Sequence, residues 1–184
     1  VIVMSENIKR CLDLANLIIK KSVFLFGPRQ TGKSTLINTE LSETFALSWN
    51  LLKGKLRLEV QRNPSYLTEQ VEFLNLHDCA IFIDEIQLCP ELLNECHLLI
   101  QERNIRFMLT GSSARKLRTL GTNLLGGRAW ERHLHPFTYS EVGESSNYNL
   151  SYIFEHGLLP SMFFSNDIEE DLSSYVGTYL TEEI

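Results

Sequence analysis

The sequence contains no run of apolar residues that approaches the length of about 20 needed to cross a bilayer. Residues 5–10, which follow Met4, are polar and lack the apolar core of a secretory signal. The hydrophobic fraction of 43% is that of an ordinary globular protein rather than a membrane protein. We therefore expect a cytoplasmic protein with no membrane partner.

Cysteine is scarce and unpaired in the sequence. The four cysteines are scattered and form no Cys-x-x-Cys pair, which favours buried reduced thiols over a metal site or a disulfide: Cys11, Cys79, Cys89 and Cys96. His133 and His135 would share one face of a strand, but zinc sites normally need a third protein ligand. We interpret both histidines as ordinary strand residues.

The sequence also lacks the Asn-Lys-x-Asp motif with which GTPases read guanine, so a guanine nucleotide is not an expected ligand. Its net charge of −6 excludes a surface that is basic throughout. One local stretch, 115–132, nevertheless carries five basic residues and a single acidic one. That stretch fits either an anionic partner or a solvated face, and nucleic-acid binding stays open.

Short apolar runs alternate with helical patterns along the chain. The predicted strands are 23–26, 45–51, 80–83 and 107–110. Residues 5–20 predict an amphipathic helix, Asn63-Pro64 predicts a helix that places Leu67, Val71 and Leu74 on one face, and Pro90 opens another. This alternation predicts an α/β domain with a mainly parallel sheet covered on both faces.

The polar stretch 143–149 is the best candidate boundary in this chain of 184 residues. We predict a core domain at 1–142, which includes the N-terminal amphipathic helix, and a helical segment at 143–184, which is too short to form a domain of its own.

The strongest motif is Gly27-Pro28-Arg29-Gln30-Thr31-Gly32-Lys33-Ser34, which fits G-x-x-x-x-G-K-[ST]. It follows an apolar run and opens a helix, where backbone N–H groups can cradle phosphates. Lys33 is expected to reach the β- and γ-phosphates, and the Ser34 hydroxyl to bind Mg²⁺. The alternative is a glycine-rich turn without a ligand. The predicted nucleotide-binding residues are Gly27, Pro28, Arg29, Gln30, Thr31, Gly32, Lys33, Ser34 and Thr35.

Two adjacent carboxylates, Asp84 and Glu85, end the apolar run 80–83. Hydrolysis of ATP needs one group to hold the hydrated Mg²⁺ and another to orient or deprotonate the attacking water. We assign the metal to Asp84 and the water to Glu85. In isolation the pair would be only a solvated strand end.

Two further positions complete the predicted catalytic set. A hydroxyl at the end of the run 107–110 could polarise the γ-phosphate, and Ser112 is preferred over Thr110, although Ser112 also fits a helix cap. Arg128 follows Gly126-Gly127, a flexible approach that could bring a guanidinium to a phosphate near the carboxyl edge of the sheet. A solvated surface arginine is the alternative.

Five segments together carry a family resemblance: GPRQTGKSTL, IFIDEIQLCPELL, FMLTGSSARKL, LLGGRAWERHLHPFTYSEV and GLLP…YVGTYLTEEI. They resemble the prokaryotic AAA+ family described as AAA_14 ATPases, whose members commonly carry a C-terminal DUF4143 domain. The resemblance implies a P-loop NTPase αβα sandwich with a five-stranded parallel sheet of order 5-1-4-3-2. It implies catalytic Glu85, sensor-like Ser112 and a functional Arg128, and a chain matching only the N-terminal ATPase part.

Three functions compete at this point. The leading hypothesis is an ATPase whose turnover moves or releases an attached module, with a homo-oligomer as a possible assembly. The second is an ATP-dependent switch with very slow turnover. The third, a small-molecule kinase, is disfavoured because a kinase gains nothing from the hydrolytic carboxylate at Glu85.

Overall fold

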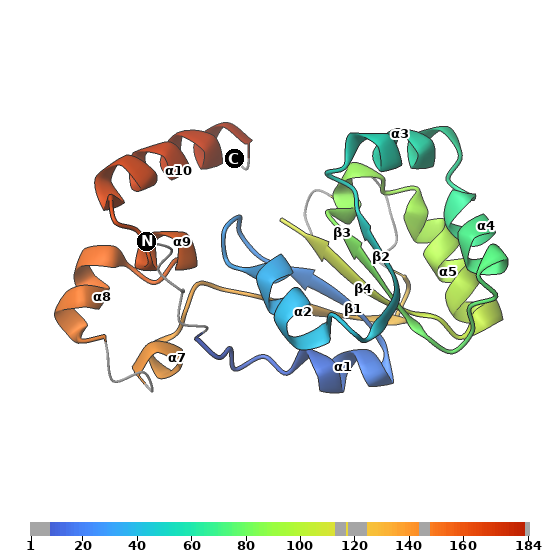
Figure 1. The fold of residues 1–184 in the computed structure, drawn as a ribbon, viewed down its shortest axis with the longest axis horizontal. Helices are drawn as coiled ribbons and strands as arrows, with labels where there is room; N and C mark the ends of the chain where they lie inside the picture. The colour runs from blue at the N-terminus through green and yellow to red at the C-terminus, as the bar shows by residue number, and fades with distance from the viewer. Residues whose placement is uncertain (1–7, 113–116, 118–124, 144–147, 183–184) are drawn as a thin grey trace. The chain divides into compact units, whose positions relative to one another are not determined.

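A computed structural model describes residues 8–112, 117, 125–143 and 148–182 (Figure 1). The chain divides into two compact units. The sheet unit comprises residues 13–27 and 33–133, and the helical unit comprises the described residues of 1–12, 28–32 and 134–184.

The sheet unit is built on five parallel strands. These are β1 (Ser22–Phe26), β2 (Phe45–Asn50), β3 (Ala80–Asp84), β4 (Arg106–Gly111) and β5 (Ala129–His133). Their order is β2-β3-β4-β1-β5, which read from β5 is the expected 5-1-4-3-2. The predicted P-loop NTPase-like α/β fold is confirmed.

Helices cover both faces of this sheet. Figure 1 shows α1 (Leu14–Lys20) and α2 (Lys33–Leu41) on one face, with α3 (Gly54–Arg62), α4 (Tyr66–Phe73) and α5 (Leu92–Arg103) on the other. A short 3-10 helix, η1 (Ile86–Leu88), follows β3. Every residue of β1 and β3 is buried, which explains why both strands read as continuous apolar runs in the sequence.

The first helix is shorter than the predicted 5–20. Helix α1 begins at Leu14, and the side chain of Asp13 caps it by accepting a hydrogen bond from the Asn16 N–H at 3.0 Å. Residues 8–12 lie outside the helix. The Cys11 N–H instead donates to the Glu141 carboxylate at 2.8 Å, and the Cys11 side chain is exposed rather than buried as predicted.

The helix predicted from Asn63 is also displaced. Asn63 ends α3, which the sequence analysis did not anticipate, by donating its N–H to the Glu59 carbonyl. Helix α4 then begins at Tyr66 and buries Leu67 and Val71, as predicted. Leu74 follows the last residue of this helix and is 45% exposed, so it does not complete the buried face.

The helical unit contains α7 (Tyr139–Gly143), α8 (Leu150–His156), α9 (Pro160–Phe163) and α10 (Ile168–Glu182). Phe137, Val142 and Phe163 form its small buried core, against which Tyr148 and Tyr152 pack. The described residues from 134 onward belong to the same compact unit as these helices. The domain boundary that the sequence suggests near residue 143 stays a prediction. Among the described helices, none combines the length and apolar character of a membrane span.

Candidate functional site

Three polar side chains form a row at the carboxyl edge of the sheet. Asn50 pairs with Asp84 across β2 and β3, and the pairing of Ile83 with Leu109 places Thr110 level with Asp84 on β4. Connections leave the neighbouring strands β1 and β4 in opposite directions, towards β2 and β5. In parallel α/β sheets, ligands bind at this edge beside such a reversal.

Asp84 is the centre of this row and is 3% exposed. Its carboxylate accepts hydrogen bonds from the Thr110 hydroxyl, from Nδ2 of Asn50 at 3.2 Å, and from Oγ of Ser34 at 3.2 and 3.3 Å. A buried carboxylate is tolerated only when donors of this kind surround it. The contacts bring Ser34, in the first turn of α2, against the end of β3.

Ser34 and Asp84 are the residues predicted to hold a metal, and their chemistry fits Mg²⁺. Magnesium takes oxygen ligands and is usually held by one or two protein groups, with phosphates and water completing its octahedron. Within the described part of the chain, no three His, Cys, Asp or Glu side chains are grouped as a metal site. A hydroxyl beside a single carboxylate therefore suits a nucleotide-bound Mg²⁺ better than a resident metal ion.

Three residues of the loop between β1 and α2 have positive φ angles. Gly27, Gln30 and Gly32 adopt φ values of 159°, 63° and 86°. Glycine accepts such angles without strain, whereas Gln30 adopts one at a cost of about 1 kcal/mol. Lys33 is 7% exposed, and its Nζ donates to the Gly27 carbonyl at 2.7 Å, which holds the ammonium over the loop.

The remaining loop positions differ in exposure. Thr31 is fully buried and its hydroxyl donates to the Pro28 carbonyl at 2.9 Å. Arg29 and Thr35 are exposed, and Pro28 is half-buried. The predicted contacts of these residues with a nucleotide remain predictions.

Glu85 leaves strand geometry immediately after Asp84. It adopts φ 61° and ψ 48°, a left-handed conformation that costs a non-glycine residue about 1 kcal/mol. Its N–H donates to Oγ1 of Thr110 at 3.1 Å, and its carboxylate accepts a hydrogen bond from the Gln87 amide. The turn therefore separates the surroundings of two carboxylates that are neighbours in sequence.

Thr110, the second choice for the predicted polar sensor, makes the contacts that link Asp84 to Glu85. It is fully buried, bonds to the Asp84 carboxylate and accepts from the Glu85 N–H. Ser112, the preferred choice, follows the last residue of β4 and is half-buried. Its sensor role stays a prediction.

Arg128 lies at the opposite edge of the sheet from Asp84, so its predicted place near the carboxyl edge is wrong. It directly precedes β5, whose first residue, Ala129, pairs with Ser22 at the start of β1. The loop before it has positive φ angles of 43° at Gly126 and 75° at Gly127. Because β1 and β5 are parallel, the four-residue step from Ser22 to Phe26 separates the two edges by about 13 Å.

His135 also differs from expectation, because β5 ends at His133 and leaves His135 outside the strand. Asn50 and Gln87 were not among the predicted site residues. One feature of the sequence could have indicated Asn50 as a site residue. It lies near the end of a predicted strand, as Asp84 and Thr110 do, and it pairs with Asp84 in the sheet. Gln87 lies in the segment IFIDEIQLCPELL, but its role was not predicted, because only the turn at Glu85 brings its amide back to the carboxylate.

A family model described as an AAA domain, AAA_14, matches residues 19–143, more than half of the chain. The chain belongs to this family. The AAA_14 match includes all five strands and both acidic residues of the site. Membership indicates nucleotide binding and P-loop ATPase character.

Two curated relatives show the same degree of similarity to this chain. They are the uncharacterized protein Mb2031c of Mycobacterium bovis and the uncharacterized protein Rv2008c of Mycobacterium tuberculosis, each 27% identical over 191 residues. The alignments cover 98% of this chain but 38% of each relative. The chain therefore spans well under half the length of the proteins it matches.

Proposed function

We propose that the chain binds MgATP and hydrolyses its γ-phosphate, and that turnover drives an attached module or partner. The observation that carries this proposal is the contact of Ser34 with Asp84, beside Lys33 and Glu85. A phosphate loop alone would serve a binding protein. A metal-binding pair next to a separately held carboxylate supports hydrolysis.

In the proposed reaction, water attacks the γ-phosphorus. The bond between the γ-phosphorus and the β,γ-bridging oxygen breaks, which releases ADP and phosphate. Glu85 orients this water and takes its proton, since a carboxylate accepts hydrogen bonds on both oxygens. Lys33 and the loop N–H groups stabilise the negative charge on the phosphate oxygens. The polar sensor is Ser112 or Thr110, and the contacts of Thr110 with both acidic residues favour it for holding their geometry.

Bound Mg²⁺ would supply charge neutralisation for the β- and γ-phosphates. Ser34 and Asp84 would hold it, with Asn50 and Thr110 fixing the Asp84 carboxylate from either side. These supporting donors keep the carboxylate in one orientation, which favours a metal with strict octahedral geometry.

Arg128 is proposed to act on the nucleotide of a neighbouring chain. Its place at the amino edge of the sheet supports a role in trans, because Ser34 and Asp84 lie at the other edge of the same chain. An arginine in that role would neutralise charge on the γ-phosphate and link turnover to a homo-oligomer. The residue belongs to the basic stretch 115–132, so an anionic partner is the competing explanation.

An ATP-dependent switch with very slow turnover is the second candidate. The Gln87 amide on the Glu85 carboxylate favours it, because a carboxylate that is held by a side chain is less available to water. The two candidates differ in turnover and not in binding.

Steady-state phosphate release decides between them, measured with and without DNA or RNA and compared with Glu85→Gln. An ATPase releases phosphate at a rate that the substitution lowers by about a hundredfold or more. A switch binds MgATP and releases phosphate equally slowly in both proteins. Competition between ATP and GTP for a fluorescent analogue tests the expected adenine preference.

A further inference from the structure

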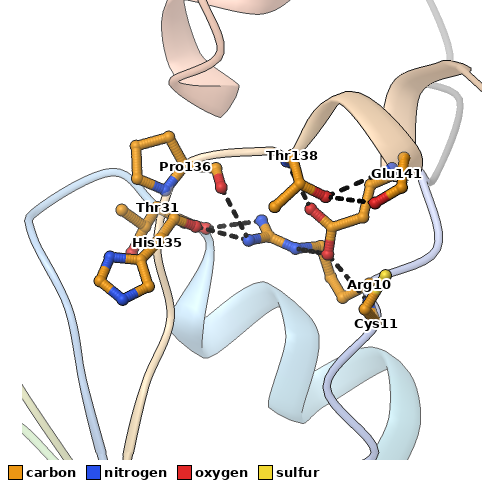
Figure 2. A network of polar contacts seen from close by, with 8 residues as sticks. Arg10, Cys11, Thr31, His135, Pro136, Thr138 and Glu141 are labelled. Atoms are coloured by element: carbon orange, nitrogen blue, oxygen red, sulfur yellow. Dashed lines mark hydrogen bonds and ion pairs between the residues drawn. The ribbon is translucent and has the colours of Figure 1, made fainter.

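A buried ion pair in the helical unit contacts the phosphate loop from outside the predicted site (Figure 2). Its members are Arg10, whose side chain is 8% exposed, and Glu141 in α7, whose side chain is 4% exposed. Nε of Arg10 lies 3.1 Å from Oε1 of Glu141. Neither residue belongs to the motifs that carry the proposed chemistry.

The Arg10 guanidinium donates hydrogen bonds to backbone carbonyls of two segments that are distant in sequence. It donates to the carbonyl of Thr31 at 3.3 Å, of His135 at 2.5 Å and of Pro136 at 3.4 Å, as Figure 2 shows. Its carbon Cζ also lies 4.8 Å from the centre of the Phe137 ring. A guanidinium suits this task because it carries five donors in a rigid plane.

Glu141 fixes the guanidinium in turn. Its Oε1 accepts from Arg10 and from the Cys11 N–H at 2.8 Å, and its Oε2 accepts from the Thr138 N–H at 2.8 Å. Removing one member of a buried pair leaves the other as an uncompensated charge. The position of Arg10 therefore depends on Glu141. The contact between Arg10 and the loop depends on Glu141 for the same reason.

The hydrogen bond from Arg10 to Thr31 fixes the orientation of the peptide that joins Thr31 to Gly32. The peptide joining Thr31 to Gly32 is trans, so its C=O and N–H point in opposite directions. Fixing the Thr31 carbonyl on Arg10 therefore turns the Gly32 N–H away from Arg10. In loops of this motif, such N–H groups are the ones that cradle phosphate oxygens.

The glycine of this peptide allows more than one backbone conformation. Gly32 has φ 86° and lacks the Cβ that would restrict it, so a flipped peptide is sterically accessible. A flip would replace a hydrogen-bond donor with a carbonyl oxygen facing the phosphates. The hydroxyl of Thr31 donates to the Pro28 carbonyl, so the contact with Arg10 is the one that fixes the Thr31 carbonyl itself.

We propose that Arg10 and Glu141 are a positioning pair for the phosphate loop: Glu141 orients Arg10, and Arg10 holds the Thr31 carbonyl so that the Gly32 N–H faces the nucleotide. This inference rests on the proposed MgATP binding at that loop. It makes phosphate affinity depend on two residues that lie 131 positions apart in the sequence.

The test compares nucleotide affinity in Glu141→Gln and Arg10→Lys with the parent chain, by calorimetry with MgATP and MgADP. Glutamine cannot accept hydrogen bonds on both sides of its head group, and lysine keeps the charge but lacks the planar fork. Affinity for both nucleotides should fall by about tenfold in either variant, the size expected for one charge-assisted hydrogen bond.

Tyr152→Phe is the matched control. It removes a hydrogen bond of 2.6 Å to the Phe163 carbonyl within the same unit, without touching the loop. A purely structural role for Arg10 and Glu141 would make all three variants alike, with lower thermal stability and parental affinity, and would overturn the inference. Arg10→Lys retains a cation for Glu141 and keeps the test decisive if Glu141→Gln fails to fold.

A Lys33→Ala arm separates this inference from the proposed function. If the parent chain binds MgATP, Lys33→Ala does not, and both variants of the pair bind like the parent, the nucleotide site stands and the positioning role is wrong. If the parent chain does not bind MgATP at micromolar concentration, both proposals are wrong.

Discussion

The hydroxyl of Ser34 lies 3.2 Å from Oδ2 of Asp84, which joins the first turn of α2 to the end of β3 across 50 positions of sequence. A hydroxyl and a carboxylate at this separation can bind the same cation with little rearrangement. Both residues lie in the sheet unit. The predictions below follow from it and from its neighbours.

Lys33→Ala should abolish MgATP binding at micromolar nucleotide, because it removes the side-chain cation that Gly27 holds over the phosphate loop. Calorimetry measures the loss. Lys20→Ala is the control, since Lys20 is exposed in the last turn of α1 and its removal changes the net charge equally. Unchanged affinity in Lys33→Ala would show that the phosphate-loop assignment is wrong.

Glu85→Gln should keep MgATP affinity within about twofold and slow phosphate release by at least about a hundredfold, because a carboxamide preserves shape but cannot take a proton. Glu102→Gln, at an exposed position of α5, controls for the lost charge. Equal rates of phosphate release by Glu85→Gln and the parent chain would show that Glu85 is not the general base.

Gln87→Ala should lower phosphate release by about tenfold at unchanged affinity if the amide holds Glu85 in its working position. If the amide instead restrains Glu85, as in the switch alternative, release should rise. Gln101→Ala, on the exposed face of α5, should leave turnover unchanged. Stopped-flow measurement of phosphate release distinguishes the two signs.

Arg128→Ala should bind MgATP normally and hydrolyse it poorly, and activity should return when it is mixed with Lys33→Ala. The mixture restores activity because an intact pocket on one chain can meet an intact Arg128 on another. If Arg128→Ala hydrolyses ATP at the parental rate at every protein concentration, Arg128 has no role in hydrolysis and is a solvated surface residue.

The Arg10–Glu141 pair should make stability depend on acid pH. Burial by itself raises the pKa of Glu141, but hydrogen bonds from Cys11 and Thr138 and the charge of Arg10 outweigh it and hold the pKa below its ordinary value of 4.5. A carboxylate with a lowered folded-state pKa stabilises fully above its unfolded pKa and loses that contribution as the pH falls through the folded value.

Urea unfolding of the parent chain and Glu141→Gln measures this contribution. The difference in the free energy of unfolding should be largest near neutral pH and shrink as the pH falls below 4.5, because a protonated Glu141 resembles glutamine. A difference that is constant over this range would mean that the Glu141 charge does not stabilise the fold.

The sequence by itself determined the parallel α/β fold and the main parts of the site. Continuous apolar runs at β1, β3 and β4 can only be buried in a sheet that is covered on both faces, and they end at Gly27, Asp84 and Gly111. Since the carboxyl ends of parallel strands share one edge, local pattern was enough to predict that Ser34 and Asp84 lie close together.

Tertiary structure alone decided which side chains meet. Thr110 rather than Ser112 contacts Asp84 because the register of β3 and β4 puts them level, and Arg128 lies at the amino edge because β5 runs parallel to β1. The Arg10–Glu141 pair was not predicted, because its members are 131 positions apart and only the tertiary structure brings them together. Periodicity reports the burial of a segment, whereas register and long-range pairing depend on the packing of the whole chain.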